Sequence, residues 1–349
     1  MVKPEDRRAL HVLAVVALMA AVPGGCGGSP TRPGPLPPGP TLTCPSPVRA
    51  VLKGDEAPAI TFDSPVVQGG VAPVSITCMP PSGTTFTVGT TSVTCTATDA
   101  NARSGSCAFD VVVERPPTLT AVKFLAFGDS VTAGTLSRPC TSSAPADATA
   151  WMLLALDIPE SYPAKLQNLL AARYVAQTVG VVNEGWPGEP AVGEGEERLP
   201  EMLEDHRPEV LLLLHGFNDL FAAGRSRTFD TAVPRIAGAL EDMVDTAKSR
   251  RVRVLLATLP ALDAGGCRGA GAPGVTALND LIRGIAADEG VGLVDLYVQL
   301  GGTPEGIIGI DGLHPTESGY TQIAQVWFEA IQRDFERRDA PSPTLDVRR

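Results

Sequence analysis

A chain of 349 residues, 44% hydrophobic and 19% charged, is long enough for two globular domains with tails. Its formal net charge of −11 repels phosphate groups, so the composition disfavours nucleic acid as a partner. No apolar run reaches the length that a membrane-spanning helix needs.

Residues 1–25 have the pattern of a secretory signal peptide. Basic residues precede a short apolar core, Val12 to Val22, and small residues lead to Cys26. The context of Cys26 resembles a bacterial lipoprotein cleavage site, although Pro23 stands where a leucine is usual. We expect either a membrane tether in the bacterial cell envelope through lipidated Cys26, or ordinary cleavage near residues 21–25 and secretion.

The chain has seven cysteines, an odd number for an exported protein. If Cys26 is lipidated, an oxidising compartment lets the other six form up to three disulfides. These six are Cys44, Cys78, Cys95, Cys107, Cys140 and Cys267. No CxxC pair or His–Cys cluster indicates a metal site.

Residues 26–41 are rich in proline and glycine and predict an extended linker. From residue 42 to 115, short β-rich runs alternate with turn residues, which predicts a β-sandwich. The runs are Ala59–Phe62, Val74–Thr77, Thr85–Val88, Ser92–Ala97 and Ala108–Val113.

Within this segment, Cys78–Val113 carries Pro-Pro-Ser-Gly, Phe-x-Val-Gly-Thr-Thr and Thr-Asp elements in order. It resembles an HYR (hyalin repeat) domain, an immunoglobulin-like module, with a departure at residues 100–102 where Gly-Asn is usual. With this resemblance we expect Cys44–Cys107 and Cys78–Cys95 disulfides, although a sequence alone leaves connectivity open. The resemblance implies adhesion or spacing, and the segment shows no catalytic constellation.

Pro116 and Pro117 mark a boundary, because two prolines break a strand ladder. Between residues 119 and 336, apolar strands alternate with helices, which predicts a flavodoxin-like three-layer αβα domain. We expect strands at Val122–Phe127, Gln177–Val182, Val210–Leu214, Val252–Ala257 and Gly292–Leu296. We expect helices at Tyr162–Ala172, Glu196–Glu204, Ala232–Ser249, Val275–Glu289 and Ser318–Arg333. Residues 337–349 predict a disordered tail.

Two long loops should follow strand ends in this domain. Residues 137–159 hold Cys140, and residues 261–273 hold Cys267. Either the two cysteines form a bridge at the rim of a site or both are free thiols.

The stretch Phe127-Gly128-Asp129-Ser130 ends the first of these strands and predicts a tight turn with an exposed serine. In open α/β sheets, ligands bind beyond the carboxyl ends of the strands. Ser130 is therefore a candidate nucleophile, and Asp129 a residue that supports the turn. By itself the motif is equally typical of an ordinary turn.

A serine hydroxyl needs a base, and that base needs an acidic partner that fixes its tautomer. Asp311 and His314 are three residues apart on one loop and meet this need. Asn218 follows the most apolar strand and can donate its amide to an oxyanion. Gly185 follows another strand and can present its backbone N–H. Trp186 beside it predicts either an apolar pocket wall or a core residue.

These elements occur in one order, and the region from about Val122 to Gln332 resembles the SGNH hydrolases, also called the GDSL esterase/lipase family. The resemblance implies Ser130 as nucleophile, His314 as base and Asp311 as acid. It also implies an oxyanion hole of the Ser130 N–H, Gly185 and Asn218. Val131 departs mildly from the leucine of the family motif. We interpret His215 as a strand-end residue rather than a second base.

The resemblance implies two-step acyl transfer to water without a metal or cofactor, on an ester of a lipid, a simple acyl group or a glycan acetyl. The alternative is a non-catalytic cell-surface adhesion protein that uses the fold as a scaffold. The complete set of five site residues argues against that alternative.

Overall fold

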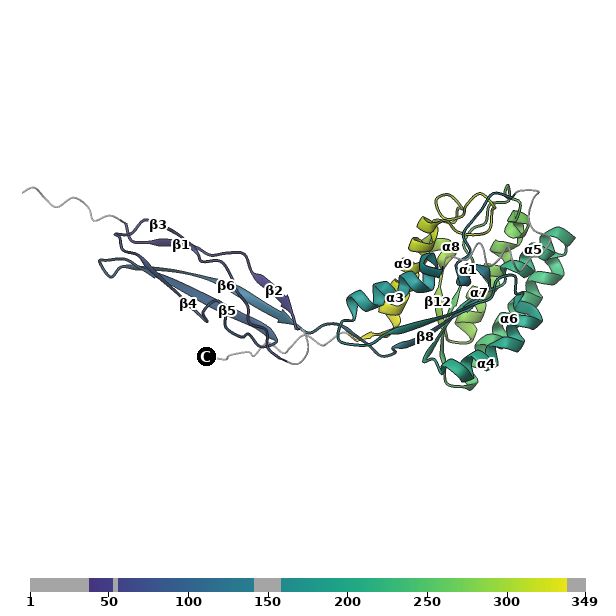
Figure 1. The fold of residues 1–349 in the computed structure, drawn as a ribbon, viewed down its shortest axis with the longest axis horizontal. Helices are drawn as coiled ribbons and strands as arrows, with labels where there is room; N and C mark the ends of the chain where they lie inside the picture. Colours follow the sequence, from purple (N-terminus) through teal and green to yellow (C-terminus); the bar gives the residue numbers. More distant parts are fainter. Residues whose placement is uncertain (1–37, 53–55, 141–157, 338–349) are drawn as a thin grey trace, which may run out of the picture.

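The computed structural model describes residues 38–52, 56–140 and 158–337. The expected signal peptide, the expected lipidation at Cys26, most of the expected linker and residues 338–349 of the expected tail lie outside the described residues. Figure 1 shows a β-rich part and an α/β part that follow one another along the chain.

The β-rich part has two sheets. Strands β1 (Thr41–Thr43) and β3 (Val66–Gln68) pair antiparallel in the smaller sheet. The larger sheet has the order β2-β6-β5-β4, formed by Val48–Val51, Ser104–Glu114, Gly89–Thr98 and Ser75–Met79. Inward residues of β5 and β6 alternate with exposed ones and bury a core that includes Val93, Phe109 and Val111. This arrangement is consistent with the predicted β-sandwich.

Two of the predicted strands in this part are wrong. Ala59–Phe62 and Thr85–Val88 form one isolated bridge, between Ala59 and Thr85, instead of a ladder. Their backbones still run side by side, since the Phe86 N–H donates to the Pro58 carbonyl at 3.0 Å. Proline at position 58 cannot donate to a neighbouring strand, which limits the ladder. Ile60 and Phe86 are buried here without regular strand pairing.

Two disulfides lie in this part, and their pairings are those expected from the sequence. Cys78 and Cys95 stand opposite each other on β4 and β5, with Cα atoms 4.0 Å apart. Cys44 follows β1 and pairs with Cys107 on β6, with Cα atoms 5.8 Å apart. The second bond therefore joins the two sheets.

The α/β part contains one parallel sheet of five strands in the order β12-β11-β10-β8-β9. These strands are Gly292–Val294, Arg253–Ala257, Val210–Leu214, Lys123–Gly128 and Gly180–Gly185. The order is that of the predicted flavodoxin-like fold. Every residue of β10 is buried, because this strand lies at the centre of the sheet between two helical layers.

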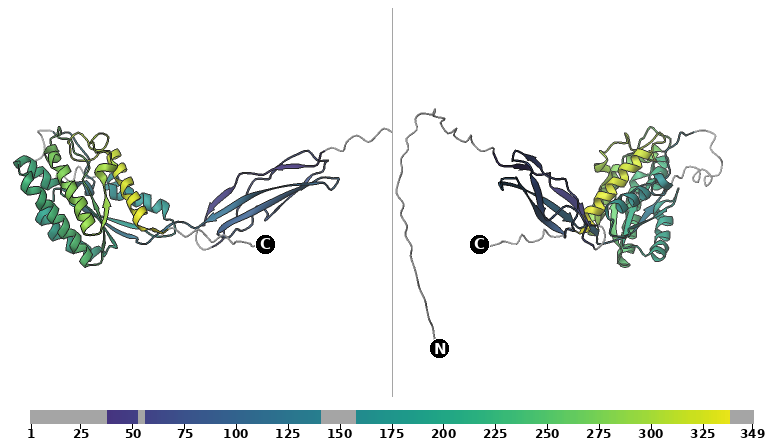
Figure 2. Two further views of the ribbon diagram at one scale, coloured as in Figure 1. Left: turned by 180° about the vertical axis from the view of Figure 1, so that it is seen from behind. Right: turned by 60° about the vertical axis from the view of Figure 1, so that its left-hand side comes forward.

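Helices cover both faces of this sheet (Figures 1 and 2). On one face α3 (Tyr162–Arg173) packs against α9 (Glu317–Phe335). On the other face α6 (Phe229–Ser249) packs against α4 (Glu196–His206) and α7 (Val275–Asp288). Shorter elements connect them: α1 (Ser130–Ala133), η1 (Ile158–Glu160), η2 (Ala191–Gly195), α5 (Phe217–Ser226), η3 (Gly269–Gly274) and α8 (Leu296–Gln299).

A two-residue ladder closes the α/β part at its boundaries. Strand β7 (Thr118–Leu119) pairs antiparallel with β13 (Glu336–Arg337). This ladder includes Thr118 and Arg337, one residue outside each end of the range 119–336 predicted for this domain. Among the helices that the structure describes, none combines the length and apolar character needed to cross a bilayer.

Candidate active site

Ser130 begins α1 directly after β8. Gly128 ends the strand, and a Cβ atom there would lie 2.0 Å from the Leu214 carbonyl oxygen, so only glycine fits. The Asp129 carboxylate accepts from the Val131 N–H at 3.1 Å and thereby caps α1. Asp129 thus supports the turn, which is the role that its place in the sequence predicts.

The Ser130 hydroxyl lies 2.9 Å from Nε2 of His314. His314 Nδ1 lies 2.6 Å from an Asp311 carboxylate oxygen. The other Asp311 oxygen accepts from the N–H groups of Leu313 and His314 at 3.0 and 2.9 Å. The structure therefore brings together the three residues that the sequence places in a catalytic chain.

All three residues are buried, which differs from the expected exposed serine. Ser130, His314 and Asp311 are 6%, 5% and 3% exposed, because the loop before α9 packs over the turn after β8. Burial raises the pKa of Asp311, but the hydrogen bond and charge of His314 and two backbone N–H groups outweigh it and lower that pKa. The carboxylate is thus held ionised beside the imidazole.

Asn218 lies in the first turn of α5, after β10. Its amide donates to the Glu189 carbonyl at 2.9 Å, which leaves the second amide hydrogen available. The sequence analysis expected no helix between Val210–Leu214 and Ala232–Ser249, so the ten-residue helix α5 was missed.

Gly185 does not occupy the position expected of it. Its N–H donates to the Asn183 side-chain oxygen at 3.0 Å and is therefore engaged. Its Cα faces α1, where an added Cβ would lie 2.0 Å from the Ala133 backbone nitrogen. Gly185 is needed for the close approach of β9 and α1, and the expectation that it donates to an oxyanion does not fit this geometry.

Gly188, three residues later, has the free N–H that Gly185 lacks. The Glu189 N–H donates to the Trp186 carbonyl at 3.2 Å, which closes a turn with Pro187 and Gly188 at its centre. Gly188 has φ 86°, as the third position of a type II turn requires. Among the described residues, nothing accepts a hydrogen bond from the Gly188 N–H. A Pro-Gly pair is the sequence signal that would have identified this turn.

This turn lies beside Ser130. The Trp186 N–H donates to the Gly128 carbonyl at 2.8 Å, two residues before the serine. Its other end contacts Asn218 through the Glu189 carbonyl. The Trp186 side chain is 61% exposed, so it is not a core residue.

Comparison with known families identifies both parts of the chain. The family model of the GDSL-like lipase/acylhydrolases matches residues 126–322. The chain belongs to this family. The HYR domain model matches residues 37–113.

Solved structures with this fold include three enzymes. The lipase/acylhydrolase from Enterococcus faecalis is 24% identical over 62% of this chain and 99% of its own, with a TM-score of 0.46. Est24, a carbohydrate acetylesterase from Sinorhizobium meliloti, is 18% identical over 60% and 98%, with a TM-score of 0.48. A catalytic mutant of Axe2, an acetylxylan esterase from Geobacillus stearothermophilus, is 20% identical over 60% and 94%, with a TM-score of 0.45. A comparison with curated proteins finds no match.

As a member of the GDSL-like family, the protein is a carboxylic ester hydrolase. Its disulfides and its HYR domain indicate an extracellular protein. The substrate of a GDSL-like hydrolase is not determined by its fold.

A third disulfide of this GDSL-like hydrolase joins the two loops in which the sequence places Cys140 and Cys267. The Cys267 loop packs against the loop of Asp311 and His314, since the Arg268 N–H donates to the Asp311 carbonyl at 2.7 Å and the Asp263 N–H to the Gly312 carbonyl at 3.0 Å. The bond therefore anchors a segment that supports Asp311.

Behind the active site of this GDSL-like hydrolase lies a buried charged group that the sequence analysis did not recognise. His215 has Glu189 Oε2 3.1 Å from its Nε2 atom, and Asp129 Oδ2 3.6 Å from its Nδ1 atom. Burial lowers the pKa of His215, but the two carboxylates outweigh this and raise it to about 9. The Gly216 N–H, 2.9 Å from Nδ1, favours the neutral ring instead. Two buried carboxylates act more strongly on the ring than one neutral amide, so we assign the imidazolium.

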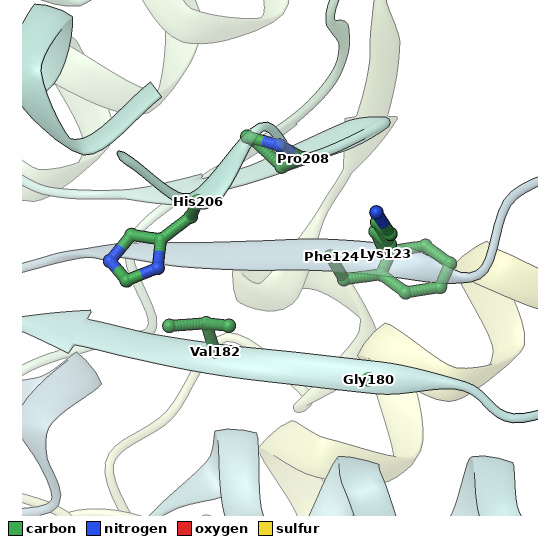
Figure 3. A pocket seen from close by; sticks show the side chains of 6 residues that line it. All are labelled: Lys123, Phe124, Gly180, Val182, His206 and Pro208. Atoms are coloured by element: carbon green, nitrogen blue, oxygen red, sulfur yellow. The ribbon is translucent and has the colours of Figure 1, made fainter. Parts of the chain in front are cut away.

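A cavity of about 250 Å³ lies at the opposite end of the sheet (Figure 3). Its walls come from the amino ends of β8 and β9 and from the end of α4: Lys123, Phe124, Gly180, Val182, His206 and Pro208. Ser130 and Asn218 follow the carboxyl ends of their strands, so this cavity lies away from the candidate active site. Within residues 38–52, 56–140 and 158–337, no group of three or more metal-ligating side chains is arranged to hold an ion.

Proposed function

We propose that the protein is an exported serine esterase in which Ser130 is the nucleophile, His314 the general base and Asp311 the residue that orients the imidazole. The observation that carries this proposal is the continuous hydrogen-bonded chain from Ser130 Oγ through His314 to Asp311, with distances of 2.9 and 2.6 Å. The same chain disfavours a non-catalytic adhesion protein, which has no need of a buried and ordered triad.

In the proposed reaction, Ser130 Oγ attacks the ester carbonyl carbon while His314 Nε2 takes the hydroxyl proton. The tetrahedral oxyanion accepts hydrogen bonds from the Ser130 N–H, the Asn218 amide and the Gly188 N–H, and Gly188 thus takes the role that the family resemblance implies for Gly185. His314 then gives the proton to the leaving alcohol. Water, deprotonated by His314, then attacks the acyl carbon. The bond from that carbon to Ser130 Oγ breaks, His314 returns the proton to Oγ, and the carboxylic acid leaves.

Three features support Gly188 as the third donor. Its N–H is without a partner among the described residues, its turn is hydrogen-bonded to Gly128, and the next residue contacts Asn218. The Gly185 N–H is not free to donate to an oxyanion, because the Asn183 side-chain oxygen already accepts its hydrogen bond.

The test is hydrolysis of p-nitrophenyl acetate and butyrate by the full chain, with Ser130→Ala as the matched control. We expect turnover by the wild type and a rate near that of uncatalysed hydrolysis for the variant. Equal rates for the two proteins would exclude the proposed mechanism. Comparison of these esters with acetylated xylan and with a lipid ester would then separate simple acyl, glycan and lipid substrates.

We also propose that lipidated Cys26 tethers the enzyme to the cell envelope through the linker of residues 26–41. The support is the sequence pattern around Cys26. Metabolic labelling with a fatty-acid probe should tag the native protein and not Cys26→Ser. Absence of label from both would mean plain secretion.

A further inference from the structure

Glu189 is a buried carboxylate that the proposed mechanism does not use. Its side chain is 3% exposed, and the residue directly follows Gly188 in the sequence. Arg198 holds it with two hydrogen bonds, Nε to Oε1 at 2.6 Å and Nη2 to Oε2 at 2.8 Å. His215 completes the set, with Nε2 3.1 Å from Oε2. A buried charge with three such contacts, two from Arg198 and one from His215, is held in one orientation.

The backbone of the same residue contacts the proposed oxyanion hole at two points. The Glu189 carbonyl accepts from the Asn218 amide at 2.9 Å and so fixes that side chain. The Glu189 N–H closes the turn that presents Gly188, through its bond to the Trp186 carbonyl. Any shift of Glu189 therefore moves two of the three proposed donors.

The partners of Glu189 are themselves anchored to the elements around the serine. The Arg198 guanidinium lies 4.2 Å from the centroid of the Phe127 ring, in the strand that leads to Ser130. Its Nη2 also donates to the Glu184 carbonyl at 3.0 Å. His215 faces Asp129, the residue before the serine. Gly195 leaves room for this ring, since a Cβ there would lie 2.8 Å from His215 Nε2.

We infer that Arg198, Glu189 and His215 form a buried positioning network that sets the geometry of the oxyanion hole. It joins four segments: β8 with its turn, the Gly188 turn after β9, helix α4 that carries Arg198, and the start of α5 after β10. These are positioning residues, because they act on the oxyanion through Asn218 and the Gly188 N–H. The inference rests on the proposed function, since it assigns the network a role in that reaction.

The test compares Glu189→Gln and Arg198→Lys with wild type in the full chain. Glu189→Gln keeps the shape and removes the charge, and Arg198→Lys keeps the charge and removes the two-pronged contact. Arg173→Lys is the matched control, because Arg173 makes a similar two-pronged contact with Glu336 at the domain boundary, at 2.7 and 3.0 Å. A fluorophosphonate, left to react to completion, counts the competent serines in each preparation.

A displaced oxyanion hole stabilises the transition state less, and it leaves the binding of the ester substrate nearly unchanged. We expect kcat per titrated serine to fall about 10- to 100-fold in both network variants, as for misplacement of a catalytic group by a fraction of an ångström to one ångström. KM should change less than about twofold, because only the transition state carries the full negative charge. Affinity for phenylboronic acid, whose serine adduct carries an oxyanion-like hydroxyl, should fall by the same factor as kcat. Arg173→Lys should leave all three quantities at the wild-type values.

A merely structural role gives a different result. It lowers the melting temperature or the number of titratable serines, with kcat per serine and boronate affinity unchanged, and that result would overturn the inference. Because kcat is expressed per titrated serine, partial unfolding of a variant does not obscure the comparison. If the wild type itself shows no Ser130-dependent hydrolysis, the proposed function fails instead, and the two failures are distinguishable.

Discussion

His314 Nε2 lies 2.9 Å from Ser130 Oγ, although 184 residues separate them in the sequence. The parallel sheet makes this contact, because Ser130 follows the carboxyl end of β8 and the loop of His314 packs over that end. Asp311 meets His314 by a local turn of three residues instead. The proposed catalytic chain thus combines one contact that depends on the whole fold with one that depends on a single loop.

Replacement of Asp311 by asparagine should lower kcat by about 10³- to 10⁴-fold, because the amide no longer holds the imidazole in the tautomer that accepts the serine proton. The fold should persist, since the Asn oxygen can still accept from the Leu313 and His314 N–H groups. Kinetics on p-nitrophenyl acetate and a circular-dichroism melt measure the two effects. A kcat within tenfold of wild type would remove Asp311 from the triad.

Asn218→Ala should lower kcat by about 10²- to 10³-fold, the usual cost of losing one oxyanion donor. KM should stay close to the wild-type value, because the amide acts on charge that develops in the transition state. The measurement is steady-state kinetics on the same ester, normalised to fluorophosphonate-titrated serines. A rise in KM with unchanged kcat would instead place Asn218 in substrate binding.

Gly185→Ala should act on stability. Its Cβ would lie 2.0 Å from the Ala133 nitrogen and 2.5 Å from the Ala133 Cα, so β9 and α1 must move apart. We expect a loss of about 1–3 kcal/mol in the free energy of unfolding, typical of overpacking. Urea titration of the variant measures this. If the variant kept wild-type stability and its kcat fell a hundredfold, Gly185 would be an oxyanion donor after all.

The sequence predicted the central sheet better than its edge. The strand at Val210–Leu214 was placed without error, because burial on both faces demands an unbroken apolar run. The edge strand β9 was expected at Gln177–Val182 and lies at Gly180–Gly185. It includes polar Asn183 and Glu184, whose side chains bond to Gly185 and to Arg198. Such specific polar contacts leave no periodic signal in a sequence.

Within the site, residue types in the right order predicted the chain of Ser130, His314 and Asp311. They did not show whether Gly185 or Gly188 is the better candidate for the third oxyanion donor. That choice depends on which N–H is already bonded, and the Asn183 side chain decides it by accepting from Gly185. His215 is a strand-end residue in sequence. Its charged partners, Asp129 and Glu189, lie on the loops after β8 and β9, and only the fold brings these loops next to it.

His215 makes a prediction about pH. Its pKa of about 9 in the folded protein exceeds its ordinary value of 6.5. A raised folded-state pKa contributes stability in full below pH 6.5, and this contribution is lost as the pH rises through 9. The wild type should therefore lose more stability between pH 6.5 and 9 than His215→Gln, as measured by urea titration at each pH. Parallel curves for the two proteins would show that His215 is neutral throughout and bonded as the Gly216 contact suggests.

Removal of the Cys44–Cys107 disulfide should lower the stability of the β-rich part and leave that of the α/β part unchanged. The bond closes a loop with a sequence separation of 63 residues. In the chain-entropy model a loop of this size contributes about 4 kcal/mol to stability. The double variant Cys44→Ser, Cys107→Ser should therefore lower the melting transition of the β-rich part in calorimetry. The transition of the α/β part and the esterase activity should be unchanged, because the bond joins strands of the β-rich part alone. Parallel loss of activity would show instead that the hydrolase depends on the β-rich part for its fold.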